Sequence, residues 1–309
     1  MSAQLMKVFY SRLFLSGLLL AAAGGCSESM PTSPSATVTS PAPPPPPPAP
    51  PEASAPQRLA ALALFESASL HAALTTSPLN SAAEDGKVWF NGPCAAGSGS
   101  LQGSLDGGLS PTSGTFLPTG SHTYVVSFTN CVVDYLSGIE LNGVASAAYT
   151  AADWSNITAT VSADSVRGTG LAYLSELHDV TGDGSAVWTS VGSSRKTTTY
   201  TPAPGSRLVN NSTANVATFG GGSYSRTHPP PPQGTSSRVE QRFVNLKVAI
   251  NGTEYTLDGS LDTTYGFAGS GGTNTGEIRI INNGALVARI YGDARNALAI
   301  EVLVPLVPL

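Results

Sequence analysis

The chain has 309 residues, of which 41% are hydrophobic and only 11% are charged, and its formal net charge is −5. A mildly acidic chain without a basic cluster argues against a nucleic-acid partner and against membrane attachment through a polybasic patch. The low charge does not predict disorder, because this share of apolar residues is enough to form a hydrophobic core.

Residues 1–25 have the pattern of a targeting segment. Lys7 and Arg12 precede an apolar run, Leu13–Ala23. This run is too short for a membrane span of about 20 residues. Small residues and a cysteine follow, in the order Ala23-Gly24-Gly25-Cys26. This order resembles the lipobox of bacterial lipoproteins, and the resemblance implies cleavage before Cys26, lipidation of its thiol and export. An ordinary secretory signal and a transmembrane anchor are the alternatives.

The same resemblance implies a place in the cell envelope. Ser27 stands where aspartate is the common signal for retention in the inner membrane, so we expect an outer-membrane lipoprotein that faces the periplasm or the cell surface. Residues 26–56 then form a proline-rich stalk that includes the run Pro43–Pro48. Such a segment favours an extended polyproline II conformation, which would hold the folded part away from the bilayer.

The remaining residues, 57–309, are predicted to form one β-rich domain with a short helix at its start. Pro56–Leu74 has helical spacing of apolar residues, many alanines and a proline in the first turn. His71 lies on this helix and is interpreted as a surface or packing residue.

From Lys87 onward the apolar residues alternate with polar ones, which is the pattern of strands with one buried face. The clearest examples are Tyr124, Val126 and Phe128, then Leu246, Val248 and Ile250, then Ile278 and Ile280. Turn signals such as Asn142-Gly143 and Asn251-Gly252 recur at short intervals. The sequence therefore predicts an all-β fold, an antiparallel meander that forms a curved sheet, a sandwich or a barrel.

Gly220–Ser237 contains three consecutive glycines and four consecutive prolines, so we expect a long excursion or a boundary between two halves of the domain. In support of two halves, Phe128-Thr129-Asn130 followed by Leu141-Asn142-Gly143 is echoed by Phe243-Val244-Asn245 followed by Leu257-Asp258-Gly259. The echo suggests a duplicated hairpin, although similar turns arise independently.

Only Cys94 and Cys131 remain after Cys26, and an exported compartment permits a disulfide between them, with two buried free thiols as the alternative. The segments Cys94-x-x-Gly97, Phe128-Thr129-Asn130-Cys131 and Leu141-Asn142-Gly143 together resemble uncharacterised β-rich envelope lipoproteins of Gram-negative bacteria. That resemblance implies the same pairing of the two cysteines, and it implies no activity.

The densest group of chemically able side chains is Glu176, His178, Asp179 and Asp183. Glu176 and His178 are expected to share a strand face, and Asp179-x-Thr181-x-Asp183-Gly184 begins like a calcium loop. Ser190 stands where an EF-hand needs its bidentate glutamate, so no metal is assigned. A polar strand end with a tight turn is the other interpretation of this group.

No motif of a known nucleophile, phosphate loop or zinc site occurs, so no catalytic residue and no cofactor are assigned. The leading hypothesis is a non-enzymatic envelope lipoprotein that uses its β-domain for binding or as a structural element. An envelope protein or a glycan is the expected kind of partner. The alternatives are a binding module for an apolar or glycan ligand in the concavity of a sheet, lined by aromatic residues, and a hydrolase of unrecognised type. The aromatic residues that could line such a concavity are Trp89, Tyr124, Trp154, Tyr173, Trp188 and Tyr255.

Overall fold

A computed structural model describes most of the chain from Ala53 onward. The targeting segment, Cys26 and the stalk up to residue 52 lie outside the described residues. The residues described are 53–77, 79, 87–88, 91–94, 99–109, 115–116, 118–134, 139–153, 155–171, 175–192, 196–229, 235–266, 273–295 and 297–309.

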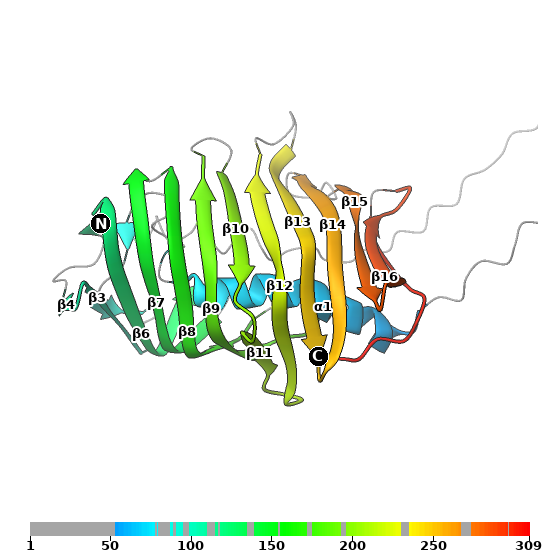
Figure 1. Ribbon diagram of the computed structural model, residues 1–309, viewed down its shortest axis with the longest axis horizontal. Helices are drawn as coiled ribbons and strands as arrows, with labels where there is room; N and C mark the ends of the chain where they lie inside the picture. The colour runs from blue at the N-terminus through cyan, green and yellow to red at the C-terminus, as the bar shows by residue number, and fades with distance from the viewer. Residues whose placement is uncertain are drawn as a thin grey trace, which may run out of the picture.

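The described residues form one helix and a large antiparallel sheet, which confirms the all-β prediction with its single N-terminal helix (Figure 1). Fifteen strands make up the sheet, whose order runs β17-β16-β15-β14-β13-β12-β10-β9-β8-β7-β6-β3-β2. Strand β11 pairs with β12 and β9, β4 pairs with β3, and β1 and β5 form a separate pair. Of the three shapes that the sequence allowed, the structure has the curved sheet.

The elements have the following bounds: α1 Ala55–Thr75, β1 Lys87–Val88, β2 Asn91–Pro93, β3 Ser100–Leu105, β4 Gly108–Leu109, β5 Thr115–Phe116, β6 Gly120–Asp134, β7 Ile139–Asp153, β8 Asn156–Thr169, β9 Asp179–Val191, β10 Lys196–Pro202, β11 Arg207–Asn210, β12 Asn215–His228, β13 Thr235–Ile250, β14 Thr253–Gly266, β15 Thr273–Asn282, β16 Ala285–Gly292 and β17 Leu298–Val302.

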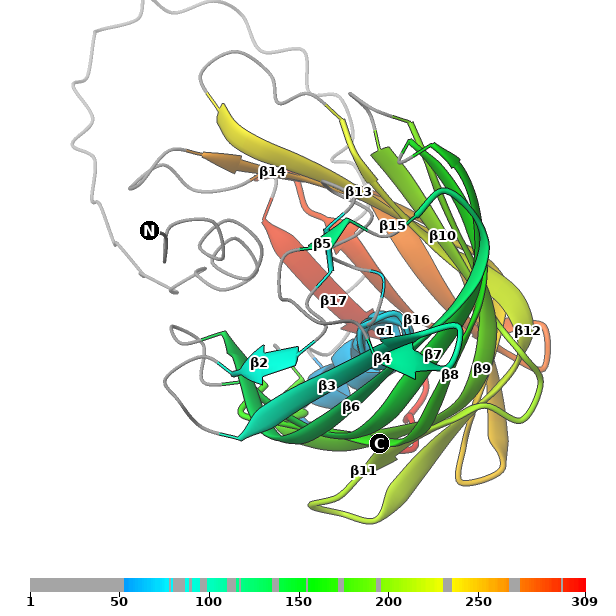
Figure 2. The ribbon, with the colours of Figure 1, turned by 90° about the vertical axis from the view of Figure 1, so that its left-hand side faces the viewer.

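Helix α1 lies on the concave side of the sheet, and its axis crosses the strands (Figures 1 and 2). At 21 residues it is about 32 Å long, enough to cross about six or seven strands. The helix packs against β17 and β16 near one edge of the sheet and against β9, β8 and β7 farther along. We call this concave side, with the helix in it, the trough.

From Ala60 onward the helix is buried on almost every side, more completely than its apolar spacing predicted. Ala61, Leu64, Ala68 and Leu70 are completely inaccessible, and so is the polar Ser67. A helix that is covered all round belongs to a protein interior and not to a surface. The inner faces of the strands supply the opposite side of the same core, including the predicted Tyr124, Val126, Phe128, Leu246, Val248, Ile250, Ile278 and Ile280.

A recurring β-bulge bends the long strands around the helix. In β6 the bulge residue Asn130 has a φ of 46°, and its N–H donates to the Asn142 side chain at 2.7 Å. Ser165 in β8 has a φ of 50° and donates in the same way to Asp183 at 2.7 Å. A β-bulge leaves one residue unpaired and increases the local bend and twist of its strand.

Each acceptor side chain is followed by a glycine with a positive φ, at Gly143, Gly184 and Gly259. These glycines touch the neighbouring chain so closely that no Cβ would fit. A Cβ on Gly143 would lie 2.6 Å from the carbonyl oxygen of Ser165, and one on Gly259 would lie 2.2 Å from that of Glu277. Bulges and glycines on successive strands therefore form a row across the sheet.

The two hairpins that echo each other in sequence share this geometry. Asn245 of β13 has a φ of 46°, and its N–H faces Asp258 of β14 at 3.4 Å, as Asn130 of β6 faces Asn142 of β7. The register of both hairpins shifts at this position, between Phe128 and Cys131 and between Phe243 and Leu246. The sequence echo thus corresponds to one repeated bulge.

The prediction that Gly220–Ser237 is a long excursion is wrong for its first part. Gly220–His228 belongs to β12, where the glycines form a bulge with register shifts around Gly221, and β13 has begun at Thr235. Consecutive glycines are a common signal of a loop, but the positive φ angles of Gly221 and Gly222 serve the bulge row instead. Strands β12 and β13 pair directly, so the sheet is continuous past the expected break between halves.

Two further connections close the fold. Cys94, just after β2, and Cys131 of β6 form the expected disulfide, with their Cα atoms 5.2 Å apart. In the chain-entropy model, closing a loop of this length contributes roughly 4 kcal/mol. The last residues, Leu303–Leu309, form a C-terminal strap, in which Leu306 and Leu309 are buried.

The row of bulges predicts a strong dependence of stability on its glycines. Gly259→Ala should lower the free energy of unfolding by about 2 kcal/mol or more, because it adds a steric clash to an unfavourable φ of +122°. Gly252→Ala is the matched control, since Gly252 also has a positive φ but would have nothing within 4 Å of its Cβ. Denaturant unfolding of both variants measures the difference. Equal losses in the two variants would contradict the close approach of β14 to β15.

Candidate functional site

The predicted cluster of Glu176, His178, Asp179 and Asp183 does not form a site. Glu176 and His178 precede β9 and do not share a strand face as predicted. Both are exposed, and His178 donates from Nδ1 to the carbonyl oxygen of Leu171 at 2.5 Å. The positive φ of Glu176, 63°, interrupts the extended backbone that the shared face required.

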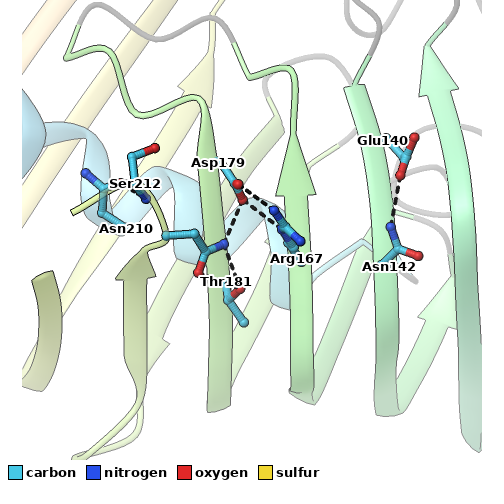
Figure 3. Close-up of polar contacts among 8 residues, drawn as sticks. Glu140, Asn142, Arg167, Asp179, Thr181, Asn210 and Ser212 are labelled. Atoms are coloured by element: carbon cyan, nitrogen blue, oxygen red, sulfur yellow. Dashed lines mark hydrogen bonds and ion pairs between the residues drawn. The ribbon is translucent and has the colours of Figure 1, made fainter. Parts of the chain in front are cut away.

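The two aspartates lie on β9 and are each engaged by an arginine of a neighbouring strand. Arg167 forms a two-pronged ion pair with Asp179, at 2.9 and 2.6 Å, on the outer face of the sheet (Figure 3). Asn211 adds a third hydrogen bond to this carboxylate, at 2.7 Å, and the Arg167 guanidinium holds the pKa of Asp179 below its usual value. This carboxylate is therefore ionised and paired.

Asp183 is engaged in the bulge row. Its Oδ1 accepts the N–H of Ser165, and its Oδ2 accepts from Arg207 at 3.1 Å. Neither aspartate is oriented toward a shared cation. Within the described residues, no group of three or more His, Cys, Asp or Glu side chains is arranged to hold a metal ion.

The polar group that sequence reasoning missed lies inside the trough. His71 of α1 is completely buried, and its Nε2 donates to the backbone carbonyl of Asp183 at 2.9 Å. Because a carbonyl only accepts, the hydrogen of the neutral ring is on Nε2, and Nδ1 accepts from the Tyr200 hydroxyl at 2.5 Å. Thr75 lies 3.1 Å from the same hydroxyl.

Glu66 is a second buried polar contact between the helix and the surrounding chain. Its carboxylate accepts from the backbone N–H of Ser175 at 3.0 Å and from the Ser175 hydroxyl. The only signal in the sequence was an acid within an apolar, alanine-rich helix. The partners of Glu66 and His71 lie more than 100 residues away along the chain, so no local pattern reveals them.

A shallow recess of about 280 Å³ lies where the turn after β3 meets β6 and β7. His122 donates there from Nδ1 to Asp106 at 2.7 Å and from Nε2 to the carbonyl of Thr119 at 3.2 Å. The Asp106 carboxylate raises the pKa of His122, consistent with a ring that donates from both nitrogens. With both nitrogens engaged as donors, His122 has no free position to act as a general base.

The aromatic residues that could have formed a ligand face lie in the core where they are described. Tyr124, Trp188 and Tyr255 are each no more than 3% exposed. Trp89, Trp154 and Tyr173 lie outside the described residues. These three aromatic side chains therefore fill the interior and do not line an open cleft.

Comparisons with known proteins give no family. No family model matches the chain, no curated protein is significantly similar to it, and no solved structure matches it. In the described part of the chain, no helix has the length and apolar character needed to cross a membrane.

The buried His71 predicts a loss of stability in mild acid. Burial lowers its pKa to about 4, whereas the unfolded chain binds a proton near 6.5. The unfolded state therefore gains a proton first as pH falls, and stability is lost between pH 6.5 and about 4. Over this window the unfolding free energy of the wild type should fall by about 3 kcal/mol more than that of His71→Phe.

His122→Gln is the control for this experiment. Because the pKa of His122 is raised in the folded state, its ion pair contributes fully to stability below pH 6.5. This contribution is lost as the pH rises through the pKa of His122 in the folded state. This variant should therefore retain the acid-side loss that His71→Phe abolishes. If the unfolding free energies of the wild type and of His71→Phe fell in parallel between pH 6.5 and 4, His71 would not be buried as a neutral ring.

Proposed function

We propose that this chain is an envelope lipoprotein whose β-domain is a non-catalytic structural or binding body, held on a membrane surface by its N-terminal stalk. The observation that carries the proposal is the filled trough. A curved sheet with an open concavity would offer a ligand site, but here helix α1 occupies the concavity with side chains such as Leu64 and Leu70, which are fully buried.

The state of the polar side chains supports a non-catalytic role. A catalytic site needs an activated group, such as a nucleophile beside a base or a carboxylate with a raised pKa. In the described residues, the strongest polar candidates are paired within the sheet or buried against the helix. Asp179 has a lowered pKa through Arg167, and the imidazole of His71, which the helix itself carries, is completely buried against Tyr200.

The outer face of the sheet is the surface that such a body would present. It is rich in hydroxyl side chains, which form ladders such as Ser146 with Ser162 and Ser121 with Thr150. Ion pairs interrupt these ladders, for example Arg279 with Asp258 on β15 and β14. A face of this composition suits polar partners, which agrees with the expected envelope protein or glycan.

The N-terminal sequence supplies the anchor in this proposal. The stalk leads to the first turn of α1, where the side chain of Gln57 binds Leu306 of the C-terminal strap. The Gln57 amide oxygen accepts from the N–H of Leu306 at 2.5 Å, and the Gln57 amide nitrogen donates to the carbonyl of Leu306 at 3.3 Å. The anchor would therefore attach to the most enclosed element of the domain.

Lipidation at Cys26 is tested by Cys26→Ser. This variant should either keep an unprocessed N-terminus or be released as a soluble protein, because serine offers no thiol for the lipid. Membrane fractionation and the mass of the N-terminal peptide provide the measurements, and Cys94→Ser with Cys131→Ser is the control that removes other cysteines. If Cys26→Ser were processed and fractionated like the wild type, the lipoprotein assignment would be wrong.

The filled trough is tested with a fluorescent apolar probe. The native chain should not enhance the fluorescence of the probe, because α1 already covers the apolar side of the sheet. Leu64→Pro breaks the helix at a fully buried position and is the positive control, since it should expose this surface. Saturable binding of the probe to the native chain would instead favour a module for apolar ligands.

A further inference from the structure

The sheet has two edges, and they differ in how they are protected. At one end, β2 has only three residues, including Pro93, which has no N–H to offer, and Cys94 beside it is fixed by the disulfide to Cys131. Short edge strands and prolines are the usual means of preventing a further strand from pairing. This edge is therefore blocked.

The opposite edge, β17, has none of these features. Leu298–Val302 contains no proline and no lysine, and it pairs with β16 in unbroken register. Among the described strands, β17 has β16 as its only partner. Since Leu303 donates its N–H to Val287 of β16 and backbone directions alternate along a strand, the N–H and C=O of Ile300 point toward the free edge.

The side chains along this edge are incompletely covered. Leu298, Ile300 and Val302 pack against the core but are only partly buried. The chain continues into Leu303 and Val304, which are 48% and 49% exposed and are among the most exposed large hydrophobic residues described. An additional strand at this edge would remove apolar area from water as well as satisfy backbone groups.

We propose that β17 pairs with β17 of a second copy of this chain, antiparallel and about a two-fold axis at Ile300. The strand is complementary to itself in this register. Ile300 meets Ile300, Leu298 meets Val302, and the only charged residue, Glu301, meets Ala299 and not another glutamate. The Glu301 carboxylate is already paired with Arg289 of β16, so the approach of two copies brings no unpaired like charges together.

The two-fold arrangement also fits the shape of the trough. The sheet is bent along its strands, around an axis parallel to α1, so β17 is at an end of the trough and not on its rim (Figures 1 and 2). Pairing at this end would continue one sheet through two copies. Because a two-fold contact uses the same edge of both copies, neither copy has that edge free for a third, and assembly stops at a dimer. This inference concerns assembly and does not depend on the proposed anchor or function.

Cross-linking tests the register. In a hydrogen-bonded antiparallel pair the two Cα atoms are about 5.5 Å apart, within the range of a disulfide. The full chain with Cys26→Ser and Ile300→Cys has one free thiol per copy, because Cys94 and Cys131 are bonded to each other. It should form a covalent dimer on mild oxidation. Val304→Cys in the same background is the matched control and should stay uncross-linked, because its two copies would be far beyond disulfide range.

Two substitutions at the same position separate backbone pairing from side-chain contact. Ile300→Pro removes the outward N–H without affecting the bonds to β16, and it should raise the dissociation constant of the dimer by about tenfold or more, since two hydrogen bonds are lost per dimer. Ile300→Ala keeps the N–H and should have a smaller effect. Sedimentation measures the dimer, and circular dichroism establishes that each variant is folded.

The proposal would be overturned by a wild-type chain that is monomeric at the highest concentration reached, with no cross-link in the Ile300→Cys variant. A dimer unaffected by Ile300→Pro would place the interface elsewhere and would overturn it as well. Cross-linking of the Ile300→Cys variant only to a different envelope protein would show that the edge receives a foreign strand and not a second copy.

Discussion

The structure depends on the burial of one helix along the inside of one bent sheet. Neither part forms a core by itself, because most of the stability of a helix in a protein comes from the packing of its apolar side chains, and a single sheet leaves its apolar face exposed. Contact requires the strands to curve around α1, and the row of bulges provides that curvature. Close approach also requires small residues under the helix: a Cβ on Gly182 would lie 3.0 Å from Leu74, and one on Gly168 would lie 3.1 Å from the same side chain.

The parts of the fold that follow from local periodicity could be predicted from the sequence. The alternation at Tyr124–Phe128 and at Leu246–Ile250 identifies strands because side chains of a strand alternate between its faces. The helix was visible from Pro56 and the following alanines. Its position was not, because no local pattern specifies which sheet face a helix covers. The nearly uniform burial of α1 is a consequence of tertiary packing.

The candidate site was harder to predict, and the reason is the range of the interactions. Asp179 and Asp183 are close in sequence and look like a shared cluster, but their partners Arg167 and Arg207 come from neighbouring strands and draw each carboxylate into a separate pair. The prediction of a loop at Gly221 was wrong for a similar reason, because this glycine, a residue typical of turns, forms a bulge within β12. Residues that mark loops in most sequences here shape the interior of a continuous sheet.

The contact between the first turn of α1 and the C-terminal strap has a mechanical consequence. Gln57 holds Leu306 through two hydrogen bonds, and the strap is held in turn by Asn210 and Asn215, which donate to the carbonyls of Leu309 and Pro308. A pull along the helix axis, applied to the chain before α1, would run across the strands, so it would load the helix–sheet contact in shear and would not peel strands apart one by one. The tension is shared among many side-chain contacts at once, and the sheet bears it as a unit.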